Sequence, residues 1–207
     1  MINRQKLFHD FDKEERWLAS MAGQGYEFVS KNCLGVYRFR NSKPKDTVIR
    51  IDYRNFKHEA DFADYKVLFE DSGWKHIAGS KNSGAQYFKR LSNSADDDIF
   101  SDQASKAGRY RRLSHMYFSL AAVFLPLLAG LLASGAINIQ AFLNPKLLYQ
   151  TPGLWEKTAA DFWRAFLFET PFAVLRGLAF LAFPAMVAFS LFYAIRADII
   201  YKKSASD

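Results

Sequence analysis

Five aromatic side chains in the first half of the chain are the residues best suited to bind a ligand. They are Trp17, Tyr37, Tyr53, Trp74 and Tyr87. Aromatic rings offer wide apolar surfaces, and Tyr and Trp add one hydrogen-bonding group each. Rings at such spacings also serve as core residues. The sequence therefore leaves two interpretations open: a ligand groove between two half-domains, or a packed core.

Residue types that catalyse reactions or hold metals show no such grouping. The chain contains four histidines: His9, His58, His76 and His115. Their spacing does not match a metal site, and the sequence lacks a phosphate-binding loop, a nucleophile elbow and a dinucleotide fingerprint. The single cysteine, Cys33, excludes an internal disulfide. Asp52, between Arg50 and Arg54 on a predicted strand face, indicates a surface ion-pair ladder. We therefore expect no enzyme, no metal and no cofactor.

A basic cluster precedes the most apolar part of the chain. Arg109, Arg111 and Arg112 lie in a predicted helix that starts at Ser101 or Asp102, residue types that favour helix N-caps. Such a cluster can contact nucleic acid, but positive charges also mark the cytoplasmic end of a membrane span and favour anionic lipid. The apolar segment that follows favours the membrane interpretation, and we expect no nucleic-acid partner. We call these five residues the juxtamembrane joint.

Charge is distributed unevenly along the 207 residues, whose net charge is +7. Residues 1–112 carry 21 Lys and Arg against 16 Asp and Glu, whereas residues 113–207 carry 7 against 5. The charge-poor part contains two apolar segments long enough to cross about 30 Å of hydrocarbon as helices. We predict transmembrane helices over 113–139 and 172–197.

The basic flanks of these two segments set the expected topology. By the positive-inside rule, both termini lie in the cytoplasm and the connecting segment lies outside. Residues 140–171 are then an external loop with an amphipathic helix at the membrane surface, and residues 198–207 are a cytosolic tail. The N-terminus shows no signal-peptide pattern. We expect a multi-pass protein of the cell membrane, with the lipid bilayer as a partner.

An internal repeat organises residues 1–91. The stretches GQGYEFVSKNCLGVYRFRNS and DSGWKHIAGSKNSGAQYFKRLS place a glycine, an aromatic residue, a strand, a turn and a second strand in the same order. A helical pattern precedes each stretch. The first helix is predicted to start at Asp12, with Glu15 completing a capping box, and the second near Asp61. A predicted strand comes before each helix: KLFHDF before the first and TVIRIDYR before the second. We predict an α+β fold: tandem β-α-β-β repeats forming a sheet with helices on one face, followed by a two-helix transmembrane segment. Residues 92–112 are predicted to be a linker and the juxtamembrane helix.

These motifs resemble a bacterial family known only as domain of unknown function 2812. The resemblance rests on EERWLASMAGQGYEF, YRFR, IRIDYR, DYKVLFEDSGWKHIAG, YFKR and IFSDQASKAGRYRR, in this order over about residues 8–112. The chain departs from the family pattern at Tyr26, where typical members carry tryptophan. The resemblance implies further hydrophobic segments, genes often beside PadR-type transcription regulators, and a membrane-attached regulatory or stress-related role. It implies no catalytic residues.

Two functions from different classes remain open. The first is a cytosolic sensing or regulatory binding domain at the bacterial inner membrane, with an unidentified ligand or protein partner. The aromatic repeat, and a helix that runs from it into the first span, motivate this hypothesis. The alternative is a small accessory subunit of a membrane transport or envelope-stress complex, in which the spans make the functional contacts.

Overall fold

The computed structural model describes residues 1–91 and 98–206, and the chain divides into two compact units. Unit 1 comprises Met1–Ser114 and Arg196–Asp207, and unit 2 comprises His115–Ile195. The boundary between the units therefore falls inside two long helices, each of which contributes one end to unit 1.

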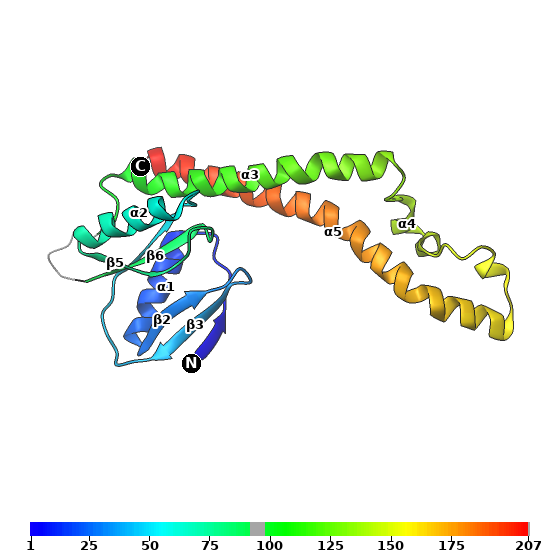
Figure 1. Ribbon diagram of the computed structural model, residues 1–207, viewed down its shortest axis with the longest axis horizontal. Coiled ribbons are helices and arrows are strands. Elements are labelled where there is room, and N and C mark those ends of the chain that lie inside the picture. The colour runs from blue at the N-terminus through cyan, green and yellow to red at the C-terminus, as the bar shows by residue number, and fades with distance from the viewer. Residues whose placement is uncertain (92–97, 207) are drawn as a thin grey trace. The chain divides into compact units, whose positions relative to one another are not determined.

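Unit 1 contains the β-α-β-β arrangement twice, as the repeat predicts (Figure 1). The first copy consists of β1 (Ile2–Gln5), α1 (Phe11–Gly23), β2 (Tyr26–Lys31) and β3 (Val36–Asn41). The second copy consists of β4 (Ile49–Tyr53), α2 (Glu59–Asp71), β5 (Trp74–Ala78) and β6 (Ala85–Arg90). The predicted α+β fold class is confirmed.

The two copies also share fine details of their backbone. Each helix is followed by a glycine in the left-handed region, with φ of +86° at Gly25 and +82° at Gly73, where other residues are strained. The Gly25 carbonyl accepts a hydrogen bond from the Ser42 amide, and the Gly73 carbonyl accepts one from the Leu91 amide. A bulge interrupts β2 and β5 at corresponding positions. The sequence repeat is therefore a repeat of structure.

The strands form two three-stranded antiparallel sheets, in the orders β1-β3-β2 and β4-β6-β5. This refines the prediction of a single sheet, because each repeat completes a sheet of its own. Side chains join the two sheets instead of a shared strand ladder. The rings of Phe28 and Tyr87 have centroids 4.9 Å apart, and Lys89 forms an ion pair with Glu27 at 3.1 Å.

Helix α1 begins two residues earlier than the capping box predicts. Its N-cap is Asp10, whose carboxylate accepts hydrogen bonds from the amides of Asp12 and Lys13 at 2.9 and 3.3 Å. The prediction that Asp12 and Glu15 cap this helix is therefore wrong, and both carboxylates have other partners. The strand predicted in KLFHDF is also displaced, because β1 ends at Gln5.

Two helices, α3 (Gln103–Ala133) and α5 (Ala159–Ser206), are long and apolar enough to cross a membrane by length and composition (Figure 1). Within unit 2 they pack through Tyr117 and Tyr193, whose ring centroids are 5.4 Å apart. Further along, Phe180 of α5 shares an apolar cluster with Ile137 and Ala141. The two predicted apolar segments are thus both helical and contact each other.

The segment between these helices is short and irregular. It contains α4 (Gln140–Leu143) and the 3-10 turns η1 (Pro145–Leu148) and η2 (Leu154–Glu156). The predicted amphipathic helix is the first part of α5, which continues through Pro171 into the second apolar segment. Glu169 accepts a hydrogen bond from the Thr151 hydroxyl at 2.8 Å, and Arg176 donates to the Leu148 carbonyl. These bonds hold the connection against α5.

Candidate functional site

The guanidinium of Arg109 lies at the centre of a buried charge network in unit 1. Its side chain has no exposed surface, although it belongs to the same helix as the first apolar segment. It donates to the carboxylates of Glu15 and Asp12, at 2.6 and 2.8 Å, and to the carbonyl of Ile51 at 2.8 Å. Arg109 therefore connects α3 to both α1 and β4.

The outer edge of β4 is covered by side chains from these two helices. The Ile51 amide donates to Glu15 at 3.0 Å, while its carbonyl is bound by Arg109. Two residues further along β4, Arg112 donates from Nε to the Tyr53 carbonyl at 2.5 Å. An open strand edge is a template for pairing with another strand. Here the side chains of α1 and α3 satisfy its backbone groups.

Asp52 occupies a different environment from the predicted surface ladder. Its side chain is only 4% exposed, which contradicts a ladder with Arg50 and Arg54 on the surface. The carboxylate pairs with Arg112 and accepts a hydrogen bond from the Tyr65 hydroxyl at 2.8 Å. The strand buries this face because α2 and α3 both pack against it. Asp52 is thus a second anchor for α3.

Tyr110 ties the start of α1 to α3. Its hydroxyl accepts a hydrogen bond from the Phe11 amide at 2.9 Å and donates to Asp10 Oδ1 at 3.1 Å. It therefore satisfies one of the free amides at the N-terminus of a helix from outside that helix. Burial raises the pKa of Tyr110 well above its ordinary value, so the hydroxyl stays protonated and keeps donating.

The network depends on an ionised carboxylate in a buried position. Burial raises the pKa of Glu15, while the charge of Arg109 and the hydrogen bonds from Arg109 and the Ile51 amide oppose that rise. Removing one member of a buried ion pair leaves an uncompensated charge, which costs about 3–5 kcal/mol. Loss of either Arg109 or Glu15 should therefore strongly destabilise the docked position of α3.

The remaining joint residues lie outside the buried charge network. Asp102 is the N-cap of α3, because its carboxylate accepts a hydrogen bond from the Ser105 amide at 2.7 Å, and the Ser101 hydroxyl donates to the same carboxylate. Arg111 is exposed, and its guanidinium lies 5.8 Å from the centre of the Tyr201 ring near the end of α5. Residues 92–97 of the predicted linker lie outside the described residues.

The five aromatic residues predicted to line a groove occupy the core of unit 1. Tyr37, Tyr53, Trp74 and Tyr87 are buried, and the partly buried Trp17 packs edge-on against Tyr37. Three surface pockets among the described residues are lined by other side chains. The aromatic groove gains no support from these positions.

Two of these tyrosines belong instead to a buried polar cluster that joins the repeats. The hydroxyls of Tyr37 and Tyr87 each donate to Glu14 Oε1 at 2.7 Å, and Lys31 pairs with the same carboxylate at 3.0 Å. Glu14 is 2% exposed. Burial and the adjacent Glu14 charge raise the pKa of both tyrosines, which holds their hydroxyls in the donating form. The cluster positions α1 against both sheets.

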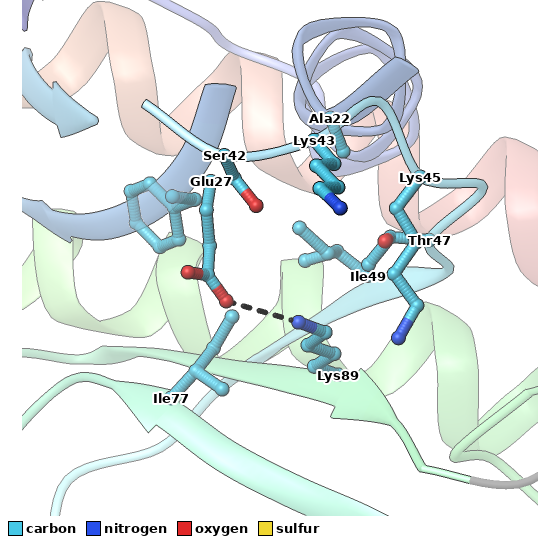
Figure 2. Close-up of a pocket in the computed structure, with 10 residues that line it drawn as sticks. Ala22, Glu27, Ser42, Lys43, Lys45, Thr47, Ile49, Ile77 and Lys89 are labelled. Atoms are coloured by element: carbon cyan, nitrogen blue, oxygen red, sulfur yellow. Dashed lines mark hydrogen bonds and ion pairs between the residues drawn. The ribbon is translucent and has the colours of Figure 1, made fainter. Parts of the chain in front are cut away.

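A separate pocket of about 190 Å³ opens between the two repeats (Figure 2). Its polar side is formed by Glu27 of β2, Lys89 of β6 and the linker between β3 and β4, which contributes Ser42, Lys43, Lys45 and Thr47. Its apolar side is formed by Ala22, Phe28, Ile49 and Ile77. The pocket thus combines a basic wall with an apolar wall.

The family described as "Protein of unknown function (DUF2812)" matches residues 10–122. The chain belongs to the DUF2812 family. No curated protein and no solved structure matches the chain.

The part of the chain shared with the DUF2812 family begins at Asp10, the N-cap of α1, and includes the whole joint. It also contains the carboxylates that sequence reasoning missed as partners of Arg109, namely Asp12 and Glu15. One signal pointed to them, since two acidic residues three apart lie on the same side of a helix. Within the described residues, no three His, Cys, Asp or Glu side chains gather as metal ligands.

Proposed function

We propose that this DUF2812 protein is a bacterial inner-membrane protein whose unit 1 is a cytosolic regulatory binding module. The observation that carries the proposal is the joint. Arg109 and Arg112 hold the edge of β4, and the helix that bears them continues without a break to Ala133 through an apolar segment. A change in the position of β4 must move this helix or break the buried network.

Two features support a membrane location for the apolar helices. Only 6% and 22% of their most apolar windows are buried within the chain, whereas core helices of soluble proteins are mostly buried. Their remaining apolar surface needs lipid or protein to cover it. The end of α5 also belongs to unit 1, where Tyr201 lies beside Arg111. This supports a topology with both termini on the same side of the membrane, and the basic flanks of the apolar helices favour the cytoplasmic side.

The topology can be tested with the single cysteine. Cys33 is exposed in unit 1, so a membrane-impermeant maleimide should label it only after the inner membrane of spheroplasts is permeabilised. The matched variant is Cys33→Ala with Lys157→Cys, which places the thiol in the connecting segment and should be labelled in intact spheroplasts. Labelling of Cys33 in intact spheroplasts would overturn the proposed topology.

The coupling through the joint can be tested by hydrogen exchange on the full chain in lipid nanodiscs. Arg109→Gln should speed exchange in β4 and in the first three turns of α3 by one to two orders of magnitude, because a buried carboxylate loses its partner. Arg111→Gln removes the same charge from the same helix but leaves the network intact, and it should leave both regions unchanged. Equal effects of the two variants would show that the buried network does not couple the helix to the sheet.

The second candidate is an accessory subunit of a membrane complex. It is favoured by the apolar side chains that face outward from the long helices, such as Val123 and Leu175. The two candidates can be distinguished by placing a photo-crosslinking residue either at position 123, in α3, or at position 43, in unit 1. Protein adducts from position 123 together with none from position 43 would favour the accessory subunit.

A further inference from the structure

We propose that the pocket between the two repeats binds a small organic anion, with a carboxylate or phosphate on its basic wall and a short hydrocarbon part on its apolar wall. The inference rests on the proposed function, because it names the class of ligand that the regulatory module would sense. Nothing in the sequence pattern pointed to this pocket, since its lining comes from six separate segments of unit 1.

Positive charge exceeds negative charge around the pocket. Glu27 is already matched, because it pairs with Lys89 at 3.1 Å and with Arg40 at 2.9 Å. Lys43 and Lys45 form no ion pair with any of the described residues. Lys43 and Lys45 are exposed, so they add positive charge to the pocket that no carboxylate of the described residues pairs with. Such a wall attracts an anion.

The cationic groups converge rather than spread over the surface. Figure 2 shows the side chains of Lys43 and Lys89 reaching into the pocket from opposite walls, with the Ser42 hydroxyl facing the same space. The hydroxyl of Thr47, a residue only 8% exposed, lines the pocket as well. Ammonium groups and hydroxyls are the donors that carboxylates and phosphates accept.

The linker that carries the lysines is fixed by its backbone. The Ser42 amide donates to the Gly25 carbonyl at 2.8 Å, and the Lys45 amide donates to the Ala22 carbonyl at 3.1 Å. Pro44 lies between them and has a restricted φ. A Cβ at Gly25 would come within 2.9 Å of the Ser42 carbonyl oxygen. The backbone of this linker is therefore held in place before any ligand arrives, which lowers the entropic cost of binding.

The opposite wall limits the ligand to a small molecule with an apolar part. Phe28 and Ile49 are buried side chains of the two sheets, and Ile77 adds a partly buried methyl surface. The volume of about 190 Å³ lies below the 300–1,000 Å³ of sites for drug-sized ligands. An anion with a few carbon atoms fits this space.

The site connects to the joint through β4. Ile49 lines the pocket, and two residues later the backbone of Ile51 is bound by Glu15 and Arg109. A ligand that shifts the start of β4 therefore acts on the strand that anchors α3. This gives the proposed regulatory module a physical path from ligand to helix.

The test is isothermal titration calorimetry on the full chain in a neutral maltoside detergent. The probes are acetate, butanoate, inorganic phosphate and butyl phosphate, all too short to partition into the detergent. We expect saturable binding of butanoate or butyl phosphate, at least fivefold tighter than acetate or inorganic phosphate, because each buried CH₂ contributes about 0.8 kcal/mol. The tighter of the two organic probes identifies the acidic group.

Variants assign the binding to this pocket. Lys43→Ala with Lys45→Ala should weaken binding at least tenfold, whereas the exposed pair Lys13→Ala with Lys203→Ala should change it less than twofold. Absence of saturable binding with all four probes, equal affinity for the short and long probes, or equal effects of the two double variants would overturn the site. None of these results touches the maleimide labelling or the Arg109→Gln exchange experiment, so failure of the site and failure of the proposed function are distinguishable.

Discussion

The two repeats share one plan, but their helices have different environments. α1 buries four apolar residues and two carboxylates: Phe11, Leu18, Met21, Ala22, Glu14 and Glu15. α2, of the same length, buries only Phe62 and Tyr65. α1 contacts strands of both sheets as well as α3, while α2 packs on its own sheet. The first helix is therefore the element that joins the parts of unit 1.

This difference explains why the two helices differ in their buried residues while the strands of the two copies match closely. The strands keep the same register, bulge and closing glycine because each sheet must be completed in the same way. The helices have no such shared requirement. α1 carries Glu14 and Glu15 toward partners in the second repeat and in α3, and α2 has no counterpart to them. The two copies therefore share a strand frame, whereas the joint combines α1 of the first copy with β4 of the second.

The largest expected difference between the two helices is in core packing. Leu18 is 0% exposed, and Leu18→Ala should lower the free energy of unfolding of unit 1 by about 2–5 kcal/mol, because it leaves a cavity. Leu68 of α2 is 63% exposed, and Leu68→Ala should change it by less than about 0.5 kcal/mol. Denaturant titration of the full chain, read from the slowest-exchanging amides of unit 1, measures both. Similar losses for the two variants would remove the distinction between the helices.

A smaller effect separates the buried tyrosines of the two repeats. Tyr87 donates to Glu14 across the repeats, and Tyr65 donates to Asp52 within the second repeat. Tyr87→Phe and Tyr65→Phe each remove one hydrogen bond to a charged group and should each lower the free energy of unfolding by about 1–3 kcal/mol.

The two tyrosine variants should differ in which elements of unit 1 are destabilised. Tyr87→Phe should speed hydrogen exchange in α1 as well as in β6, because it weakens a bond between the repeats. Tyr65→Phe should speed exchange in α2 and β4 and leave α1 unchanged. Faster exchange of α1 in both variants would mean that Glu14 is not the specific link between the copies.

Much of this fold follows from local sequence, whereas the joint does not. The alternation in TVIRIDYR and the glycine before each second strand predict β4 and both helix ends correctly. Arg109 binds Asp12, which is 97 positions away, and no local pattern encodes that pairing. A basic residue beside an apolar segment is also expected from topology alone. From the sequence alone, Arg109 and Arg112 are therefore predicted to contact lipid, whereas in the structure both bind backbone carbonyls of β4.

The weakest expected difference between the repeats is a dependence on pH. At corresponding positions, β2 carries Phe28 and β5 carries His76, whose ring nitrogen is 3.0 Å from Gln86 Oε1. Burial lowers the pKa of His76, and the hydrogen bond with Gln86 opposes this only in part. The unfolded chain therefore binds this proton more readily than the folded one. Stability from this group is present above the ordinary histidine pKa of about 6.5 and is lost as the pH falls below it.

Exchanging the residues of the two repeats tests this dependence. His76→Phe should flatten the fall in unfolding free energy between about pH 6.5 and 5, at a cost of about 1 kcal/mol at pH 8 because Gln86 loses a partner. Some slope should remain, since burial and then the charge of Arg196 lower the pKa of His9 as well. The reverse exchange, Phe28→His, should steepen the same slope by placing a second histidine in a buried strand. An unchanged slope in His76→Phe would show that β5 tolerates the charged ring, and that the two sheets do not differ in their response to acid.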